Sequence, residues 1–421
     1  MMPTDDVRRA NQLHRLAWLT VALLWPVALL NYLDRQMLAA MKYSVMEEIP
    51  SIGLDANWGY MLGQFKWVYA FLSPIGGYVA DRFSRRATIC ASLFAWSAIT
   101  WATGHVTDYT SLLWTRTLMG VSESFYIPAA LALIADYHPS TTRSRAVGVH
   151  QMAIYAGMIL GGFGGHVADR PDLGWRFAFD ATGLIGIIYA LPLWWLLRDA
   201  PATHANGTSL EHDRPTVRAA LRNLFWNRSY LLLVACFTLP AMAGWIVKDW
   251  MPAILKDQFD IGQGVAGVSA TLYVSLASLA GAFFGGWLAD RWMLRTVRGR
   301  IYTSALGMSL LIPALFGVGD APSLAIAIVF LVLFGIGWGF FDCNNMPILS
   351  QIVRPDLRAT GYGIMNLVST SFGGFADWGF GALRDEQVPL NLIFGAFAAP
   401  ALVSVGLMLM IRPRSEPTAT H

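Results

Sequence analysis

Apolar stretches of about 20 residues, the length that a helix needs to cross the hydrocarbon core of a bilayer, recur along the whole chain. Short polar loops separate them. We therefore expect an all-α membrane protein with twelve transmembrane helices, at residues 16–41, 58–80, 87–104, 110–136, 145–168, 176–197, 229–254, 265–289, 301–318, 322–351, 360–382 and 389–411.

The pattern of the first half returns in the second half. The sequence GGYVADR at residues 76–82 reappears as GGWLADR at 285–291, and RAVG at 145–148 reappears as RATG at 358–361. The two offsets, 209 and 213 residues, nearly agree. They predict two pseudo-symmetric six-helix bundles, at residues 1–197 and 229–421, joined by a linker at 198–228. Many secondary transporters are built in this way, with the substrate site between the halves.

Composition and charge placement agree with a membrane protein. Hydrophobic residues make up 55% of the chain and charged residues 14%, against roughly 25% in soluble domains. The N-terminal tail, every second loop and the C-terminal tail hold 21 of the 30 lysines and arginines. By the positive-inside rule both termini are cytoplasmic, and we expect a multi-pass protein of the cell inner (plasma) membrane. The later part of the linker, residues 216–227, predicts an amphipathic helix on the membrane surface.

Several classes of function find no support in the sequence. The three cysteines have no metal or disulfide spacing and are interpreted as small buried residues. There is no phosphate loop for ATP and no nucleophile–base constellation, so we expect neither an enzyme nor a cofactor or metal. Neither tail is long enough for the output domain of a sensor. We expect a monomer in the lipid bilayer that binds protons and a small molecule, with no nucleic-acid partner.

The repeated arginine loops predict a gate. Small residues let two helices approach closely, and an aspartate at a helix end can pair with arginines or with the positive end of a neighbouring helix. Such contacts can form in one conformation and break in the other. The alternative is a solvated loop that obeys only the positive-inside rule. The candidate gating residues are Gly77, Asp81, Arg82, Arg85 and Arg86 in the first copy and Gly286, Asp290 and Arg291 in the second.

The first loop resembles the signature G-x-x-x-D-R-x-G-R-R/K of the major facilitator superfamily, and the resemblance covers essentially the whole chain. Ser84 stands where the signature has glycine. The resemblance implies the fold of two six-helix bundles that move by alternating access.

Ionisable side chains inside the spans are the candidate site. Each costs at least about 2.5–3.5 kcal/mol to insert and is by default a functional hypothesis. Arg116 and Glu123 lie seven residues apart, on one face of the fourth span, and Pro128 is expected to kink that helix. A purely structural salt bridge between helices is the alternative.

Residues 116–123 (RTLMGVSE) together with Pro128, and residues 31–35 (NYLDR), 174–176 (GWR) and 250–252 (WMP), resemble the anion:cation symporter branch of that superfamily. The resemblance implies a proton-coupled symporter of a sugar acid such as a hexuronate or aldonate. It implies that Asp34 and Glu123 exchange protons, that Arg35 engages the substrate carboxylate and that Arg116 holds an acid in place.

Physical chemistry is consistent with these roles. A guanidinium is always charged and offers planar donors that suit a carboxylate. Because Asp34 and Arg35 are adjacent on a helix, they point about 100° apart, so we expect one to face the substrate and the other a neighbouring helix. Asn366 on the eleventh span and Gln151 with Tyr155 on the fifth are candidate substrate contacts; interhelical hydrogen bonding is their alternative role.

Four further polar residues depart from the pattern of the branch. We expect Lys66 either to line the substrate cavity or to form a buried ion pair. We expect Lys248 either to belong to the substrate site or to extend its amine to the outer surface of the membrane. Asp342 with Asn345 suits sugar hydroxyls or a second cation. A proton-coupled transporter of a neutral sugar is therefore the alternative function, which competition between glucuronate and its parent sugar would separate.

Overall fold

The computed structural model describes residues 3–200, 217–354 and 357–413, and these residues form helices and connecting turns with no strand. The side chains of residues 3–12, Asp81, Ser140, Val217 and Ala220 lie outside what it describes. In the first half the elements are α1 (Pro3–Ala40), α2 (Lys42–Glu48), η1 (Pro50–Ile52), α3 (Asp55–Arg82), α4 (Arg85–Thr103), α5 (Tyr109–Glu123), α6 (Tyr126–Tyr137), α7 (Ser140–Gly162), α8 (Gly164–Ala168) and α9 (Gly174–Leu196).

The second half continues with α10, a short helix of the linker whose position agrees with the predicted surface helix. Residues 201–216 of the predicted linker lie outside the described residues. The elements are α10 (Val217–Phe225), α11 (Arg228–Asp249), α12 (Met251–Phe259), α13 (Gln263–Met293), α14 (Gly299–Gly319), α15 (Leu324–Asp342), α16 (Asn345–Ile352), α17 (Arg358–Asp385) and α18 (Leu390–Met410).

The expectation of an all-α membrane fold is confirmed. Within the described residues, nine helical segments are long and apolar enough to cross a membrane by length and composition alone. Three more segments, α3, α4 and α17, match the remaining predicted spans in position and are less apolar. Together they account for the twelve predicted spans.

Four of those spans consist of two helices each, namely α5 with α6, α7 with α8, α11 with α12, and α15 with α16. A kink after α5 was expected from Pro128, whereas the breaks after α7, α11 and α15 were not expected. Pro128, Pro252 and Pro347 all lie in the first turn of the helix that follows a break. Proline suits that place because it has no N–H to donate to the preceding turn. Proline alone does not decide the break, since α1, α3, α9, α11, α14 and α18 each contain an internal proline.

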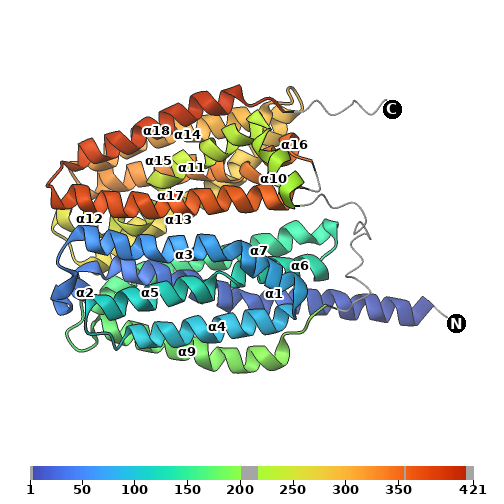
Figure 1. Ribbon diagram of the computed structural model, residues 1–421, viewed down its shortest axis with the longest axis horizontal. Coiled ribbons are helices and arrows are strands. Elements are labelled where there is room, and N and C mark those ends of the chain that lie inside the picture. The colour runs from blue at the N-terminus through green and yellow to red at the C-terminus, as the bar shows by residue number, and fades with distance from the viewer. Residues whose placement is uncertain (1–2, 201–216, 355–356, 414–421) are drawn as a thin grey trace. The chain divides into compact units, whose positions relative to one another are not determined.

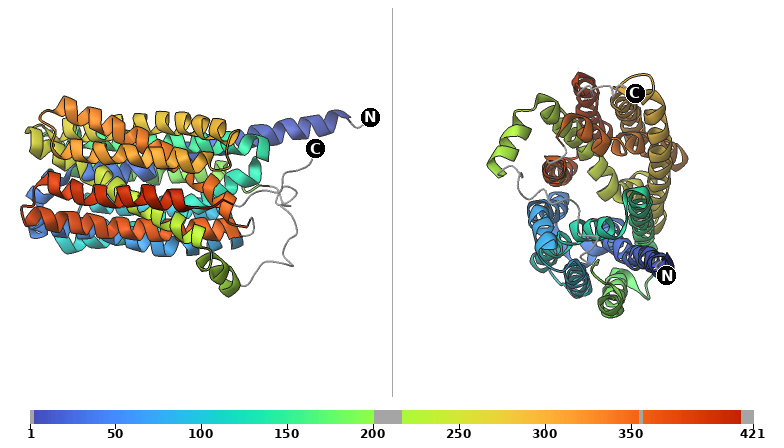
Figure 2. Two further views of the ribbon diagram at one scale, coloured as in Figure 1. Left: turned by 90° about the horizontal axis from the view of Figure 1, so that it is seen from above. Right: turned by 90° about the vertical axis from the view of Figure 1, so that its right-hand side faces the viewer.

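By its contacts the chain separates into two compact units. The first unit is residues 1–53, 64–210 and 261–268, and the second is 54–63, 211–260 and 269–421. Figures 1 and 2 show that the long helices within a unit run side by side. The packing repeats: α1 packs on α7 as α11 packs on α17, and α4 packs on α5 and α9 as α14 packs on α15 and α18. The duplication read from the sequence is thus also a duplication of helix packing.

Each unit has its own apolar core. In the first unit, Leu24, Trp96 and Tyr126 are fully buried among the helices. In the second, Tyr230 and Phe341 take comparable places among α11, α14, α15 and α17. The polar residues described next lie on the long helices that surround these cores.

Candidate functional site

A buried ion pair joins α1 and α5 in the first unit. Nε of Arg35 donates to Oε2 of Glu123 at 2.6 Å, and Nη2 of Arg35 lies 2.5 Å from the same oxygen. The Glu123 side chain is fully buried and that of Arg35 is 15% exposed. Removing either partner of such a pair leaves an uncompensated buried charge, so the two residues depend on each other.

Aromatic rings surround the Arg35 guanidinium. Its central carbon lies 4.9 Å from the ring centre of Tyr32, 4.7 Å from that of Phe65 and 4.8 Å from that of Tyr69. A cation within about 6 Å of a ring face is attracted to the ring. The rings and Glu123 therefore fix the guanidinium in one place.

Asp34 and Arg35 face different neighbours, as their adjacency on the helix predicted. Oδ2 of Asp34 accepts a hydrogen bond from Thr100 of α4 at 2.8 Å. One turn further along α4, Thr103 accepts a hydrogen bond from Nη2 of Arg116 at 2.8 Å. Both threonines are fully buried. They escaped the sequence analysis, although two threonines three residues apart in an apolar span are a recognisable polar stripe.

Arg116 belongs to the same buried cluster. The resemblance implied that Arg116 holds an acid in place, and that role remains a prediction, while Arg35 is the arginine that forms the ion pair with Glu123. The hydrogen bond of Arg116 goes to Thr103, and its guanidinium lies 5.8 Å from the ring centre of Phe179. The seven-residue spacing places Arg116 and Glu123 on one face of the span, but the pairing of Glu123 with Arg35 depends on how α1 packs against α5.

Besides Nη2 of Arg35, which belongs to the ion pair, three buried polar atoms of this cluster have no hydrogen-bond partner within the described residues: Oδ1 of Asp34, Oε1 of Glu123 and Nε of Arg116. Buried polar groups in folded proteins are nearly always hydrogen-bonded to protein or water. Two acceptors and one donor thus remain available in this buried cluster.

The second unit carries a cation and an acid of its own. Nζ of Lys248, on α11, lies 5.0 Å from the ring centre of Trp245 and 5.7 Å from that of Trp338. Asp342 is the last residue of α15, and its Oδ1 accepts a hydrogen bond from Nδ2 of Asn345 at 3.5 Å. Asp342 is exposed, whereas Asn345 is 2% exposed.

The two clusters follow the same plan. Arg35 and Lys248 are 213 residues apart, and each contacts the aromatic residue three positions before it. Glu123 and Asp342 are 219 residues apart, and each is the last residue before a helix break. A proline follows each acid at the fifth position. The sequence analysis missed this correspondence, and the two matching prolines were the signal that could have revealed it.

The remaining candidate residues lie on α3, α7 and α17, and their side chains differ in exposure. Lys66 of α3 is buried, at 3% exposure. On α7, Gln151 is exposed and Tyr155 is half-buried. Asn366 of α17 is exposed. Their substrate-binding roles remain predictions.

In the first repeated loop, two of the candidate gating arginines contact groups of their own unit. Arg85 pairs with Asp136 and donates to the carbonyl oxygen of Ala132 at 2.7 Å. The Arg86 guanidinium lies 5.0 Å from the ring centre of Trp194. Arg82 is exposed. The contacts of Asp81 lie outside the described side chains.

Ser84 in the first loop and the charged residues of the second loop also make local contacts. The Ser84 hydroxyl, where the family signature has glycine, accepts a hydrogen bond from the Ala87 N–H at 3.0 Å and so caps α4. In the second loop, Asp290 accepts a hydrogen bond from Arg300 at 3.4 Å. Arg291 lies 6.0 Å from the ring centre of Trp287. A gating role for these residues remains a prediction.

The expected close approach at Gly77 and Gly286 is wrong within the units, because it occurs one residue earlier. A Cβ on Gly76 would lie 2.6 Å from the carbonyl oxygen of Ser124, and one on Gly285 would lie 2.8 Å from Cα of Phe340. At Gly77 the nearest atom would be 3.9 Å away, and at Gly286 nothing lies within 4 Å. In both halves the first glycine of the pair is the one that lets helices touch.

Comparison with known proteins places the chain in a family of transporters. The model of the Major Facilitator Superfamily matches residues 24–376. The D-galactonate transporter of Escherichia coli O6:H1 is 24% identical over 433 residues, which cover 94% of each chain. Protein spinster of Drosophila melanogaster is 26% identical over 378 residues, which are 87% of this chain and 61% of spinster. The chain thus spans less than two thirds of spinster.

Solved structures agree on the fold. The crystal structure of a bacterial homologue of the human lysosomal transporter spinster, in an inward-facing and unoccupied conformation, has a TM-score of 0.77. It is 20% identical in sequence, and the match covers 94% of this chain and 95% of that one. The family match spans most of the sequence, and the chain therefore belongs to the Major Facilitator Superfamily of membrane transporters.

Proposed function

We propose that this transporter carries a sugar acid of the hexuronate or aldonate type together with protons across the cell inner membrane, with both termini cytoplasmic. The observation that carries the proposal is the Arg35–Glu123 ion pair, buried in one cluster with Asp34 and Arg116. The similarity to a D-galactonate transporter supports the choice of a sugar acid.

The proposed coupling is a competition for one guanidinium. A substrate carboxylate can bind Arg35 through two parallel hydrogen bonds and so draw it away from Glu123. A carboxylate left buried without its cation is strongly disfavoured, so Glu123 then takes a proton. When the substrate leaves, Arg35 returns to Glu123 and the proton is released. Each cycle thereby moves substrate and proton together.

Asp34 and Arg116 complete the cluster in this proposal. Asp34 takes part in proton exchange, since its Oδ1 has no hydrogen-bond partner among the described residues. Arg116 contributes positive charge and a free Nε donor next to the acids. Lys66, Gln151, Tyr155 and Asn366 are proposed as further substrate contacts.

The test separates exchange from accumulation. Glu123→Gln mimics the permanently protonated acid, so proteoliposomes with this variant should exchange D-galactonate present on both sides. They should not concentrate it under an inward proton gradient. Glu48→Gln is the matched control, because Glu48 also pairs with an arginine, Arg176 at 2.8 Å, but is 47% exposed. Accumulation by Glu123→Gln at the parent's level would refute the proposed role.

A neutral sugar is the second candidate substrate, favoured by the arrangement in the second unit. Asp342 and Asn345 offer groups that bind hydroxyls, and Trp245 and Trp338 lie beside Lys248. Competition decides between the two. If galactose or glucose displaces labelled galactonate as well as glucuronate does, the sugar-acid proposal is wrong and the neutral-sugar proposal stands.

A further inference from the structure

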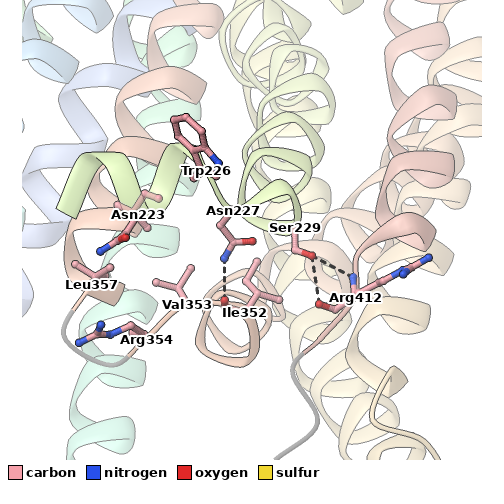
Figure 3. Close-up of a pocket in the computed structure, with 10 residues that line it drawn as sticks. Asn223, Trp226, Asn227, Ser229, Ile352, Val353, Arg354, Leu357 and Arg412 are labelled. Atoms are coloured by element: carbon pink, nitrogen blue, oxygen red, sulfur yellow. Dashed lines mark hydrogen bonds between the residues drawn. The ribbon is translucent and has the colours of Figure 1, made fainter. Parts of the chain in front are cut away.

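A cavity of about 360 Å³ lies in the second unit, at the end of α16 that carries Ile352 (Figure 3). Its walls come from α10, the first residues of α11, the end of α16, the residues that lead into α17 and the residue that follows Ile411. The ten lining residues are Asn223, Leu224, Trp226, Asn227, Ser229, Ile352, Val353, Arg354, Leu357 and Arg412.

The lining combines an apolar floor with basic and amide groups. Leu224, Ile352, Val353 and Leu357 are buried. Arg354 and Arg412 are exposed, and Figure 3 shows them on opposite sides of the cavity. None of the ten lining residues is acidic. A lining of this kind favours an anion that also has an apolar part.

Hydrogen bonds hold the walls together. The Asn227 side chain accepts from the N–H of Tyr230 at 3.3 Å and donates to the carbonyl oxygen of Ile352 at 3.0 Å. The Ser229 hydroxyl donates to the carbonyl oxygen of Arg412 at 3.2 Å and accepts from its N–H at 3.3 Å. The dashed lines in Figure 3 mark the last three of these bonds. The cavity is thus framed by segments that are far apart in sequence.

The helix α10 has the character of one that lies at a membrane surface. Arg218 and Arg222 are four residues apart and exposed, while Leu224 is buried against the unit. At the end of the helix, Phe225 is 52% and Trp226 is 84% exposed. Exposed aromatic residues next to arginines are typical of helices at the boundary between headgroups and acyl chains. That depth is where phospholipid headgroups lie.

We propose that this cavity binds the phosphate of an anionic membrane phospholipid between Arg354 and Arg412, with the acyl chains alongside Trp226. Basic pockets at the cytoplasmic ends of transmembrane helices are known to suit anionic headgroups. At about 30 Å³ per water-sized group, the cavity has room for roughly a dozen heavy atoms, the size of a glycerol phosphate. The N-terminal end of the long helix α17 starts beside Leu357 and adds positive potential.

The experiment measures lipid retention by the full chain. The protein is reconstituted in nanodiscs of phosphatidylcholine with a minor share of phosphatidylglycerol, released, and analysed by native mass spectrometry. Each arginine near a membrane surface changes the binding of anionic lipid about fivefold, so Arg354→Gln with Arg412→Gln should lower phosphatidylglycerol retention about 25-fold. Arg354→Lys with Arg412→Lys should restore most of it. The control with the same charge change is Arg145→Gln with Arg295→Gln, two exposed arginines outside the cavity.

The outcomes that overturn the proposal are distinct from a failure of folding. Melting temperatures in pure phosphatidylcholine identify any variant that is merely unfolded, and the lysine pair tests the same residues in a conservative form. Equal loss of phosphatidylglycerol in the control pair refutes the site and leaves only a general charge effect. Stabilisation of the detergent-solubilised protein by millimolar glycerol 3-phosphate as strong as that by phosphatidylglycerol also refutes it, in favour of a free phosphate site.

Discussion

The two units place a cation and an acid at corresponding positions but arrange them differently. In the first unit, Arg35 is in direct contact with a fully buried Glu123. In the second, the cation is Lys248, which lies near the rings of Trp245 and Trp338, and the acid is Asp342, which is exposed and hydrogen-bonded to Asn345. The charged positions therefore correspond between the two units, but only the first unit buries its acid in direct contact with the cation.

The difference suggests that the first unit couples proton and substrate, while the second unit recognises the substrate or a second cation. A closed pair whose partners depend on each other is suited to coupling, since separating them has a large energetic consequence. An exposed acid with an amide neighbour can change its partners at little cost, which is suited to recognition of a substrate or a second cation. The predictions that follow test this contrast, beginning with the largest expected effect.

Removing the cation should have far larger consequences in the first unit than in the second. Arg35→Ala leaves Glu123 buried without its partner, which costs about 3–5 kcal/mol of stability and should abolish binding of galactonate. Arg35→Lys keeps the charge but loses the planar fork, so affinity should fall at least about tenfold. Lys248→Ala should lower the melting temperature much less. Calorimetric binding and thermal unfolding of the three variants check this, and unchanged affinity in Arg35→Ala would remove the anion-site hypothesis.

Alanine substitutions of the paired glycines should show which glycine of each pair is in close contact with another helix. Gly76→Ala forces a Cβ to 2.6 Å from a backbone oxygen of Ser124 and should cost about 1–3 kcal/mol. Gly77→Ala meets its nearest atom at 3.9 Å and should leave the melting temperature unchanged. Gly285→Ala and Gly286→Ala should repeat this difference. A lower melting temperature for Gly77→Ala, with none for Gly76→Ala, would contradict the assignment of the close contacts.

These glycines also mark the boundary of what sequence can predict. The spans can be predicted from apolar stretches of about 20 residues, and the duplication from repeated sequence motifs, because neither pattern depends on how the helices pack. Which glycine of a pair touches another helix depends on a rotation of about 100° between neighbours. The two glycines of each pair are neighbours in the sequence, and only the packed structure shows that Gly76, and not Gly77, is in close contact with another helix.

In the candidate site, too, the sequence predicts which residues are buried together but not which of them pair. The burial of Arg35, Glu123 and Arg116 near one another follows from the high cost of isolated charges in a membrane. The choice of partner does not follow, because it depends on which helix faces which. Thr100 and Thr103 carry no charge and so gave only a weak signal, although they hold Asp34 and Arg116.

Removing the hydroxyl that holds Asp34 should have an intermediate effect. Thr100→Val keeps the shape of the side chain but removes the 2.8 Å hydrogen bond to Asp34. Hydrogen bonds to charged groups contribute about 1.5–3 kcal/mol, so proton-driven uptake of galactonate should fall by roughly tenfold or more. Thr182→Val is the control, since that hydroxyl donates only to backbone carbonyl oxygens of its own helix. Equal uptake by Thr100→Val and the parent would show that Asp34 needs no fixed orientation.

The smallest effect on stability and binding is expected at the repeated loops. The Asp290 side chain is 76% exposed and lies 3.4 Å from Arg300, and exposed ion pairs contribute about 0–1 kcal/mol. Asp290→Asn should therefore leave the melting temperature and the calorimetric affinity for substrate nearly unchanged. If the loops form the gate, the same variant should still slow transport, because it alters the contacts that differ between conformations.

Asp81→Asn provides the corresponding change in the first loop and should show the same separation of rate from affinity. Initial uptake rates in proteoliposomes, set beside calorimetric affinities, measure it. Cysteine accessibility at the arginine-rich ends of the helices reports the motion of the gate independently of substrate. Loss of affinity with this motion intact would place the loop aspartates in substrate binding, and the contrast between a gate at the loops and a coupling pair at Arg35 and Glu123 would then fail.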